Sequence, residues 1–187
     1  MKWLPIIIVL SVFLLDQGSK LLVVKNLTLI DHNIVDSEKY RVQVIGDYVR
    51  LKYVENKGMA FGFLSDASEV VRILVFTSLT IIAIGVVIYY FMNVQKDKIL
   101  VKSSFALILG GAVGNLSDKL FGAITFHQEL KLLYAKVVDF IDVGINDMRW
   151  PTFNVADIAI TLGVFLLLYL ILTNKEEEIF STAKKEA

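Results

Sequence analysis

A chain of 187 residues that is 56% hydrophobic and has no formal net charge is too apolar for an ordinary soluble domain, and its length fits one membrane domain. Because the charge is balanced, nothing favours a nucleic-acid partner. The lack of cysteine excludes disulfides, thiol nucleophiles and cysteine-bound metals, and His32 and His127 are too far apart in sequence to favour a zinc site. We therefore expect neither a metal nor a cofactor.

Four apolar segments are long enough to cross a hydrocarbon core of ~30 Å, which takes ~20 helical residues. The first segment begins like a signal peptide, MKWLPIIIVLSVFLL, but no small-residue cleavage site follows, so we expect it to be retained. The chain is therefore predicted to be one integral membrane domain, 1–187, with long links at about 25–72 and 123–152. The predicted spans are about 3–24, 73–92, 103–122 and 153–172.

The first long link is predicted to contain strands and then the start of a helix. Within 41–56, RVQVIGDYVRLKYVEN, the apolar residues Leu51 and Tyr53 alternate with basic ones, a period of two that is typical of strands. Asp66 and Glu69, three residues apart, fit a capping box. A helix is therefore expected to begin here and to continue into the second span.

The short link between the second and third spans decides the predicted orientation. It contains Lys96, Lys98 and Lys102 against the single acid Asp97, which favours the cytoplasm. The longer links contain more basic residues, but acids balance them, so their counts do not decide. Together with Lys2, the short link predicts that both termini are cytoplasmic and that the long links lie outside.

The unusual polar residues gather at one end of the predicted bundle, whichever way it is oriented. In a chain with four spans, the ends of spans one and three and the start of span four share a face with both long links. Ionisable residues inside a span are functional candidates, and a cluster at one depth is a stronger indication than any single one. The residues concerned are Asp16, Gln17 and Lys20, and those of 56–61 (NKGMAF), 110–119 (GGAVGNLSDK), 137–142 (VVDFID) and 153–157 (FNVAD).

Several of these residues also have a purely structural interpretation. Asp16 and Lys20 are four residues apart and can form an ion pair on one helix face. The glycines of 110–114 can allow close packing of membrane helices. Asn154 can cap a helix, and Lys119 can be an interfacial charge at the end of a span.

Asp139 and Asp157 are the main candidates for chemistry. Two carboxylates close together at a partly desolvated site cannot both ionise cheaply, so one keeps a proton while the other acts as a base. The base can deprotonate a water that attacks a peptide carbonyl, and the acid can then protonate the amine. Asp142 competes with Asp139, but in an extended strand the two face opposite ways. The residues alone leave an aspartyl hydrolase, an ion or proton pathway and a metal site open.

Five motifs taken together resemble the lipoprotein signal peptidase (signal peptidase II) family. They are DQGSK, ENKGMAFGF, GGAVGNLSDK, VVDFID and FNVAD, in this order across residues 16–157. The resemblance implies an aspartic endopeptidase that removes the signal peptide from diacylglyceryl-modified prolipoproteins, cutting before the lipidated cysteine. Its partners would be these prolipoproteins and membrane lipid, and we expect a monomer. A proton- or ion-coupled transporter that uses the same carboxylates is the alternative.

The resemblance also implies a fold and a set of site residues. The expected fold is an all-α membrane protein, with four transmembrane helices, a small β-rich extracytoplasmic cradle and a short peripheral helix. It would be a multi-pass protein of the bacterial inner membrane with its active site near the extracytoplasmic face. By position the catalytic pair is Asp139 and Asp157. The substrate-binding or supporting positions are Asp16, Lys20, Asn56, Gly58, Ala60, Gly111, Asn115, Lys119 and Asn154.

Two features depart from the pattern of this family. Lys119 stands where the family commonly has arginine, and lysine lacks the planar fork for a bidentate contact. The segment 123–136, AITFHQELKLLYAK, is longer than the usual connection before VVDF. We expect an added hairpin or loop near the substrate entrance.

Overall fold

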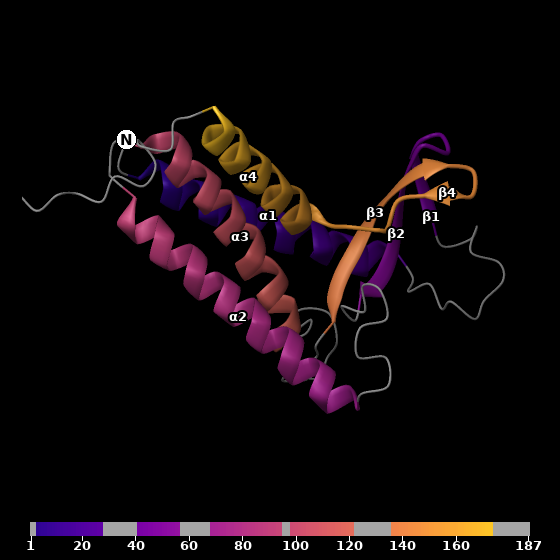
Figure 1. The fold of residues 1–187 in the computed structure, drawn as a ribbon. Coiled ribbons are helices and arrows are strands. Elements are labelled where there is room, and N and C mark those ends of the chain that lie inside the picture. Colours follow the sequence, from indigo (N-terminus) through magenta and orange to yellow (C-terminus); the bar gives the residue numbers. More distant parts are fainter. Residues whose placement is uncertain (1–2, 28–40, 57–67, 95–97, 122–135, 174–187) are drawn as a thin grey trace, which may run out of the picture.

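The computed structural model describes residues 3–27, 41–56, 68–94, 98–121 and 136–173, which form four long helices and a small sheet (Figure 1). This confirms the predicted fold class of a mostly helical membrane protein with a small β-rich part. The elements in chain order are α1 (Leu4–Asn26), β1 (Arg41–Ile45), β2 (Val49–Asn56), α2 (Glu69–Asn93), α3 (Ile99–Phe121), β3 (Val137–Ile145), β4 (Met148–Arg149) and α4 (Val155–Leu172).

Each helix in the described part of the chain contains a stretch that is long and apolar enough to cross a membrane. The stretches differ from the predicted spans by about one helical turn or less at each end. Large apolar side chains such as Leu14 and Phe165 lie on the outside of the bundle, because lipid rather than water surrounds it. The four stretches are Leu4–Asn26, Ile73–Asn93, Ile99–Phe121 and Val155–Leu172.

Helix α3 is the centre of the bundle and packs against α1, α2 and α4. Its glycines allow the neighbouring backbones to come close. A Cβ atom added to Gly110 would lie 2.9 Å from Val12 Cβ on α1, and one added to Gly111 would collide with the Ala156 carbonyl on α4. The end of the bundle away from the sheet has an apolar core of Val94, Val101, Phe105 and Leu170.

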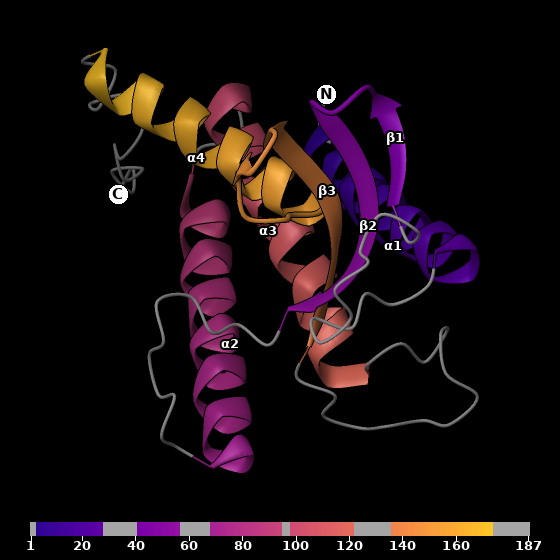
Figure 2. The same ribbon diagram turned by 90° about the vertical axis from the view of Figure 1, so that its right-hand side faces the viewer.

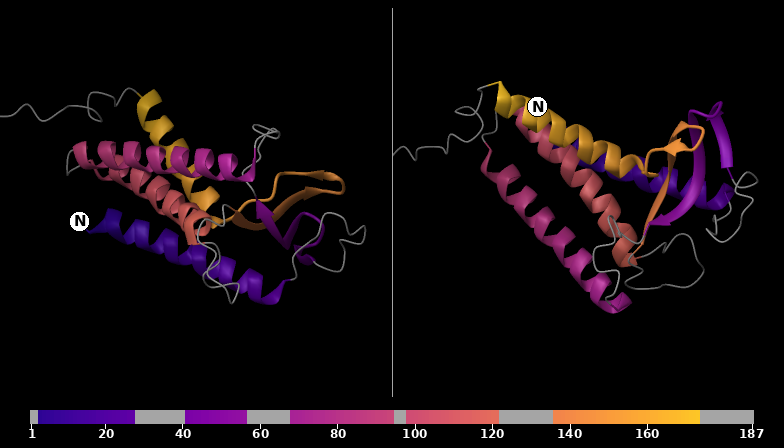
Figure 3. Two further views of the ribbon diagram at one scale, coloured as in Figure 1. Left: turned by 90° about the horizontal axis from the view of Figure 1, so that it is seen from below. Right: turned by 45° about the vertical axis from the view of Figure 1, so that its right-hand side comes forward.

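The four strands form one antiparallel sheet in the order β1-β2-β3-β4 at one end of the bundle. Figure 2 looks onto this end. The strands run across the helix axes rather than along them (Figures 1 and 3). Tyr53, Val138 and Phe140 of the sheet pack against Val23 of α1, and this second apolar core fixes the sheet over the end of the bundle.

The predicted strands in 41–56 are present as β1 and β2, but their burial does not follow a simple alternation. The pairing of β2 with β3 shifts register between Leu51 and Val54. A shift of this kind changes which face a side chain occupies. As a result Arg50 and Tyr53, three residues apart, are both buried.

The second span starts at Ile73, as predicted, but the N-cap of helix α2 differs from the predicted one. Helix α2 begins at Glu69 with Ser68 as its N-cap, and Ser68 Oγ accepts a hydrogen bond from the Val71 amide at 3.4 Å. The predicted cap Asp66 lies outside the described residues. So does most of the segment 123–136, and the predicted short peripheral helix is not among the elements of the described residues.

Candidate active site

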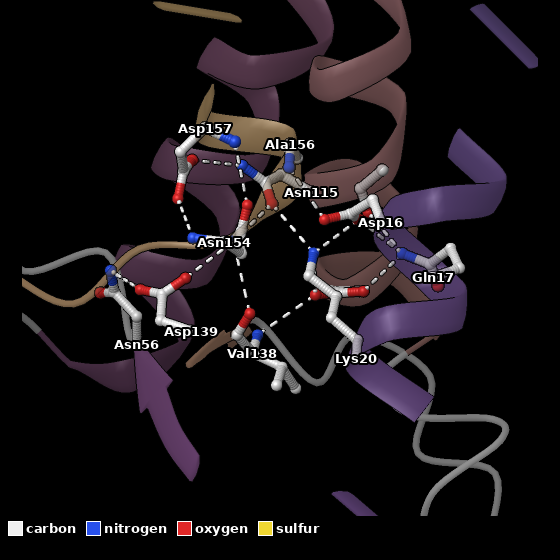
Figure 4. Close-up of polar contacts among 12 residues, drawn as sticks. Asp16, Gln17, Lys20, Asn56, Asn115, Val138, Asp139, Asn154, Ala156 and Asp157 are labelled. Atoms are coloured by element: carbon white, nitrogen blue, oxygen red, sulfur yellow. Dashed lines mark hydrogen bonds and ion pairs between the residues drawn. The ribbon is translucent and has the colours of Figure 1, made fainter. Parts of the chain in front are cut away.

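A buried ion cluster lies where α1 meets α3 (Figure 4). Asp16 and Lys20 have no exposed surface, and Lys20 Nζ lies 2.8 Å from Asp16 Oδ2, which confirms the predicted ion pair. Lys20 Nζ also lies 2.8 Å from Asp118 Oδ2 of α3. Removing one member of a buried pair typically costs roughly 3–5 kcal/mol, because the other charge is left without compensation.

The ion cluster ties the helices to the sheet through backbone amides. The Ala156 amide of α4 donates to Asp16 Oδ1 at 3.0 Å, and the Val138 amide of β3 donates to Asp118 Oδ2 at 3.1 Å. Gln17 Nε2 bridges the two carboxylates, since it donates to Asp16 Oδ2 at 3.1 Å and to Asp118 Oδ1 at 3.0 Å. The cluster therefore holds α1, α3, β3 and the first turn of α4 in one arrangement.

Asp139 comes from the middle of the buried part of β3 and is only 2% exposed. Its Oδ2 accepts a hydrogen bond from Asn56 Nδ2 at 2.8 Å, and its Oδ1 accepts one from Asn154 Nδ2 at 2.7 Å. Both donors are neutral amides. They orient the carboxylate without neutralising its charge.

Asp157 lies in the first turn of α4 and forms a capping box with Asn154. The Asp157 amide donates to Asn154 Oδ1 at 2.9 Å, and the Asn154 amide donates to Asp157 Oδ2 at 3.1 Å. Asn115 Nδ2 of α3 donates to Asp157 Oδ1 at 2.9 Å. Asn154 is thus the predicted helix cap, and it also connects Asp157 with Asp139 (Figure 4).

The two aspartates of β3 lie in opposite electrostatic surroundings. Burial, helped by the negative charge of Asp157, raises the pKa of Asp139 to about 6, although the hydrogen bonds from Asn56 and Asn154 oppose the shift. Asp142 is also buried, but the Arg149 hydrogen bond and the nearby Lys52 charge outweigh the burial and hold its pKa below the usual 3.8. Asp142 is therefore a firmly paired anion.

Most of the predicted site residues meet in this one network, and two residues join it that the sequence interpretation did not assign to the site. Gln17 and Asp118 were noted only as polar residues of the motifs. Asp118 is three residues after Asn115, a spacing that places both on one face of α3 and could have indicated it. The predicted residues in the network are Asp16, Lys20, Asn56, Asn115, Asp139, Asn154 and Asp157.

The remaining predicted residues lie beside the network or outside the described part. Gly111 faces the backbone of α4, so its role in the structure is close packing. Lys119 Nζ donates to Thr80 Oγ1 of α2 at 2.9 Å and is close enough to Asp157 for an electrostatic interaction. Gly58 and Ala60 lie outside the described residues.

The described residues contain no group of three or more histidine, cysteine or acidic side chains that could hold a metal ion. The chemistry that the site offers is that of two carboxylates oriented by amides. Fold and site together define a multi-pass membrane protein with a candidate aspartyl centre at the sheet end of its helix bundle.

The family model described as signal peptidase (SPase) II matches residues 8–173, and the chain belongs to this family. Among its relatives is a protein named lipoprotein signal peptidase from Syntrophus aciditrophicus (strain SB). It is 35% identical over 167 residues, which are 89% of this chain and 91% of the relative. A lipoprotein signal peptidase from Pseudoalteromonas atlantica is 35% identical over 174 residues, 93% of this chain and 90% of the relative.

Two solved structures share the fold. Both are described as bacterial membrane enzymes determined by the in meso method, one at 1.9 Å and one at 2.3 Å resolution. The first has a TM-score of 0.70 at 26% identity and covers 91% of this chain and 93% of its own. The second has a TM-score of 0.69 at 27% identity and covers 98% of this chain and 92% of its own. The predicted family and fold class are therefore confirmed.

Proposed function

We propose that this chain is an aspartic endopeptidase that removes the signal peptide from prolipoproteins. Membership of the signal peptidase II family and relatives named lipoprotein signal peptidase support this activity. Because the family and these relatives are peptidases, the transporter alternative has no support. Its substrate is the diacylglyceryl-modified prolipoprotein, which it cuts immediately before the lipidated cysteine. The observation that carries the proposal is the pair Asp139 and Asp157, bridged by Asn154.

The proposed reaction uses the two aspartates as one titrating unit. The raised pKa of Asp139 favours a state in which the pair shares a single proton. The ionised carboxylate takes a proton from a water molecule, and the water attacks the carbonyl carbon of the scissile peptide. The protonated carboxyl supports the developing oxyanion and then gives its proton to the leaving amine. These reaction steps need neither a metal nor a cofactor.

The neighbouring residues are proposed to orient this pair and the substrate. Asn56, Asn115 and Asn154 hold the carboxylate oxygens with amide donors. Lys20 donates a hydrogen bond to Asn115, and Asp16 accepts one from the first turn of α4, so this ion pair helps to hold both in place. Gly58, Ala60, Gly111 and Lys119 complete the proposed set of substrate-binding or supporting positions.

The proposed setting is the bacterial inner membrane, with the whole chain as one integral domain. Four apolar helices support a multi-pass arrangement. We place both termini in the cytoplasm and the sheet, the links at about 25–72 and 123–152 and the active site on the extracytoplasmic side, where an exported substrate meets them. The protein acts as a monomer, and the apolar spans admit the acyl chains of the substrate from the side.

The test is cleavage of a diacylglyceryl-modified prolipoprotein by the purified protein in detergent, followed by gel shift. Asp139→Asn and Asp157→Asn should each lower the rate by ~10²–10⁴-fold or more, the usual contribution of a positioned acid or base. Asparagine keeps the shape but can neither carry the proton nor act as the base. Asp142→Asn in the same strand is the matched control and should keep substantial activity. An inactive Asp142→Asn beside an active Asp139→Asn would reverse the assignment within VVDFID.

A second arm separates an aspartyl mechanism from a metal-dependent one. Cleavage should be unchanged by a chelator and by added divalent ions, because no step uses a metal. Loss of cleavage in chelator, with recovery on adding a divalent ion, would overturn the proposed mechanism but not the substrate.

A further inference from the structure

We propose that the free end of the sheet is a lipid-binding anchor that lies in the headgroup region of the bilayer. The surface concerned, called here the sheet tip, consists of Ile45, Tyr48, Ile145, Met148 and Trp150. Ile45, Ile145 and Met148 are the strand residues next to the β1–β2 and β3–β4 turns, Tyr48 lies in the β1–β2 turn, and Trp150 lies in the chain that leads into α4. Neither the proposed catalysis nor the proposed substrate contact uses them.

The two turns that carry the sheet tip lie side by side. The Gly144 amide donates to the Tyr48 carbonyl at 3.0 Å. The Asn146 amide donates to Asp47 Oδ2 at 2.8 Å, and Arg149 Nη1 donates to the Asp47 carbonyl. These bonds fix the turn that contains Tyr48 against the turn that lies between Ile145 and Met148.

The side chains of this surface are apolar or aromatic, and they are exposed. Met148 is 85% exposed and Trp150 is 70% exposed, while Ile45, Tyr48 and Ile145 are each more than half exposed. In water this exposure would be unfavourable by about 25 cal/mol for each Å² of apolar surface. Contiguous patches of this kind on a protein surface usually bind a partner or a membrane.

The charges at the sheet tip are mostly paired with one another. Asp47 forms ion pairs with Arg50 and with Arg149, and Arg149 also pairs with Asp142 at 2.9 Å. This pairing leaves little net charge to repel lipid. Asp147 in the β3–β4 turn stays exposed, which suits the polar headgroup region and not the hydrocarbon core. Tryptophan and tyrosine are the side chains that favour this region.

The geometry of the fold brings this surface to the bilayer. The strands run across the helix axes, so the end of the sheet extends sideways from the bundle (Figures 1 and 3). If the helices cross the bilayer, this direction runs along the bilayer surface. Trp150 is five residue steps before Val155, the first residue of α4. An extended chain of this length spans at most about 18 Å. Trp150 therefore lies within about 18 Å of the first residue of the fourth span, which keeps the headgroup region within its reach.

Tryptophan fluorescence tests the proposal directly, because the sequence has only two tryptophans, Trp3 and Trp150. In Trp3→Phe the emission comes from Trp150 alone. The variant is reconstituted in phosphatidylcholine vesicles with acyl chains brominated either near the headgroup or near the terminal methyl group. Bromine near the headgroup should quench Trp150 by about half, and bromine near the chain end should quench it much less, because tryptophan prefers the interface.

A second reporter keeps the test independent of any local effect at Trp150. Tyr48→Trp in a Trp3→Phe, Trp150→Phe background places the only indole in the β1–β2 turn, and the same quenching pattern is expected. Trp150→Phe, which retains Trp3 at the start of α1, is the matched interfacial control.

Two outcomes would overturn the proposal. Trp150 that is insensitive to brominated lipid and open to a water-soluble quencher on both sides of the membrane would lie in water. Trp150 that is insensitive to brominated lipid and also shielded from that quencher would be covered by protein, such as a second copy of the chain. Neither outcome bears on the cleavage reaction, so this proposal can fail while the proposed function stands.

Discussion

Asn154 shows how much of the site depends on a single neutral side chain. Its Oδ1 accepts a hydrogen bond from the Asp157 amide. Its Nδ2 lies within hydrogen-bonding distance of three acceptors: Asp139 Oδ1 at 2.7 Å, Asn115 Oδ1 at 3.1 Å and the Val138 carbonyl at 3.3 Å. An amide can donate and accept at once, whereas an ionised carboxylate can only accept. Aspartate at this position would still cap α4 but would put a third carboxyl group beside the pair.

The raised pKa of Asp139 predicts a pH dependence of stability. Because the folded state binds this proton more tightly than the unfolded state, its contribution is full below about pH 4 and is lost as the pH rises through about 6. The loss amounts to at most about 3 kcal/mol. In detergent, the fall in melting temperature from about pH 4.5 to about pH 7 should therefore be smaller for Asp139→Asn than for the unmodified protein.

Asp142→Asn is the control for this experiment. Its pKa is lowered in the folded state, so the stability that it contributes is lost only as the pH falls below about 4. The variant should be less stable at both pH values but should keep the slope of the unmodified protein. An unchanged slope in Asp139→Asn would contradict the predicted titration.

Lys119 provides a charge near Asp157 and a hydrogen bond to Thr80, and two substitutions separate these roles. If the charge matters, Lys119→Arg should keep most cleavage activity, and Lys119→Gln should lose ~10-fold or more, in the range of charge-assisted hydrogen bonds. Thr80→Val removes the acceptor on α2 and should have the smaller effect. A fully active Lys119→Gln would mean that Lys119 is only an interfacial charge.

At the scale of the elements, the packing of α3 limits which side chains its inner face can hold. A Cβ atom at Gly111 would meet the α4 backbone, which cannot move without shifting Asp157, and one at Gly114 would lie 2.6 Å from Asp16 Oδ2. The close packing predicted from GGAVG is thus present, and it also sets the distance between the ion cluster and α4.

Gly111→Ala should therefore destabilise the protein by roughly 1–3 kcal/mol, the usual cost of overpacking. It should also lower cleavage, since the first turn of α4 has to shift. Gly85→Ala is the matched control, because no described atom lies within 4 Å of the added Cβ and alanine favours a helix. Thermal unfolding in detergent and the cleavage assay should separate the two variants. Equal melting temperatures would contradict the packing argument.

Local patterns predicted the elements well, and they predicted the contacts between elements less well. The spans follow from apolar length, and β1 and β2 follow from the pattern around Leu51 and Tyr53. The contribution of Asp118 could not be predicted, because its partners Gln17 and Val138 are distant in sequence and meet it only in the folded chain. The cap was predicted at Asp66 and not at Ser68, because Ser65, Asp66 and Ser68 are all suitable cap residues within four positions.

At the scale of the whole molecule, the order of the helices along the chain brings the site residues to one end of the bundle. The C-terminal ends of α1 and α3 and the N-terminal ends of α2 and α4 all lead to the sheet. Asn56, Asn115, Asp139 and Asp157 therefore gather at one end of the bundle, as the order of the spans predicted. Which side of the membrane this end faces stays a prediction.

A reporter that is active only outside the cytoplasm can test the orientation. Fused after Lys96 it should be silent, because the basic link between α2 and α3 is expected inside. Inserted near Gln128 it should be active, because this link is expected to share the outer side with the aspartate pair. An active fusion after Lys96 with a silent insertion near Gln128 would invert the orientation and remove the proposed exported substrate.

The bridging role of Asn154 has a consequence for how the protein is made. Synthesis proceeds from the N-terminus, and Asn154 and Asp157 arrive together with the last helix, after Asn56, Asn115 and Asp139. A nascent or truncated chain that lacks α4 holds one carboxylate of the pair and none of its cap. If Asp139 and Asp157 are the catalytic pair, as proposed, the pair is complete only once α4 has joined the bundle, and a chain that stops before α4 should therefore cleave no substrate.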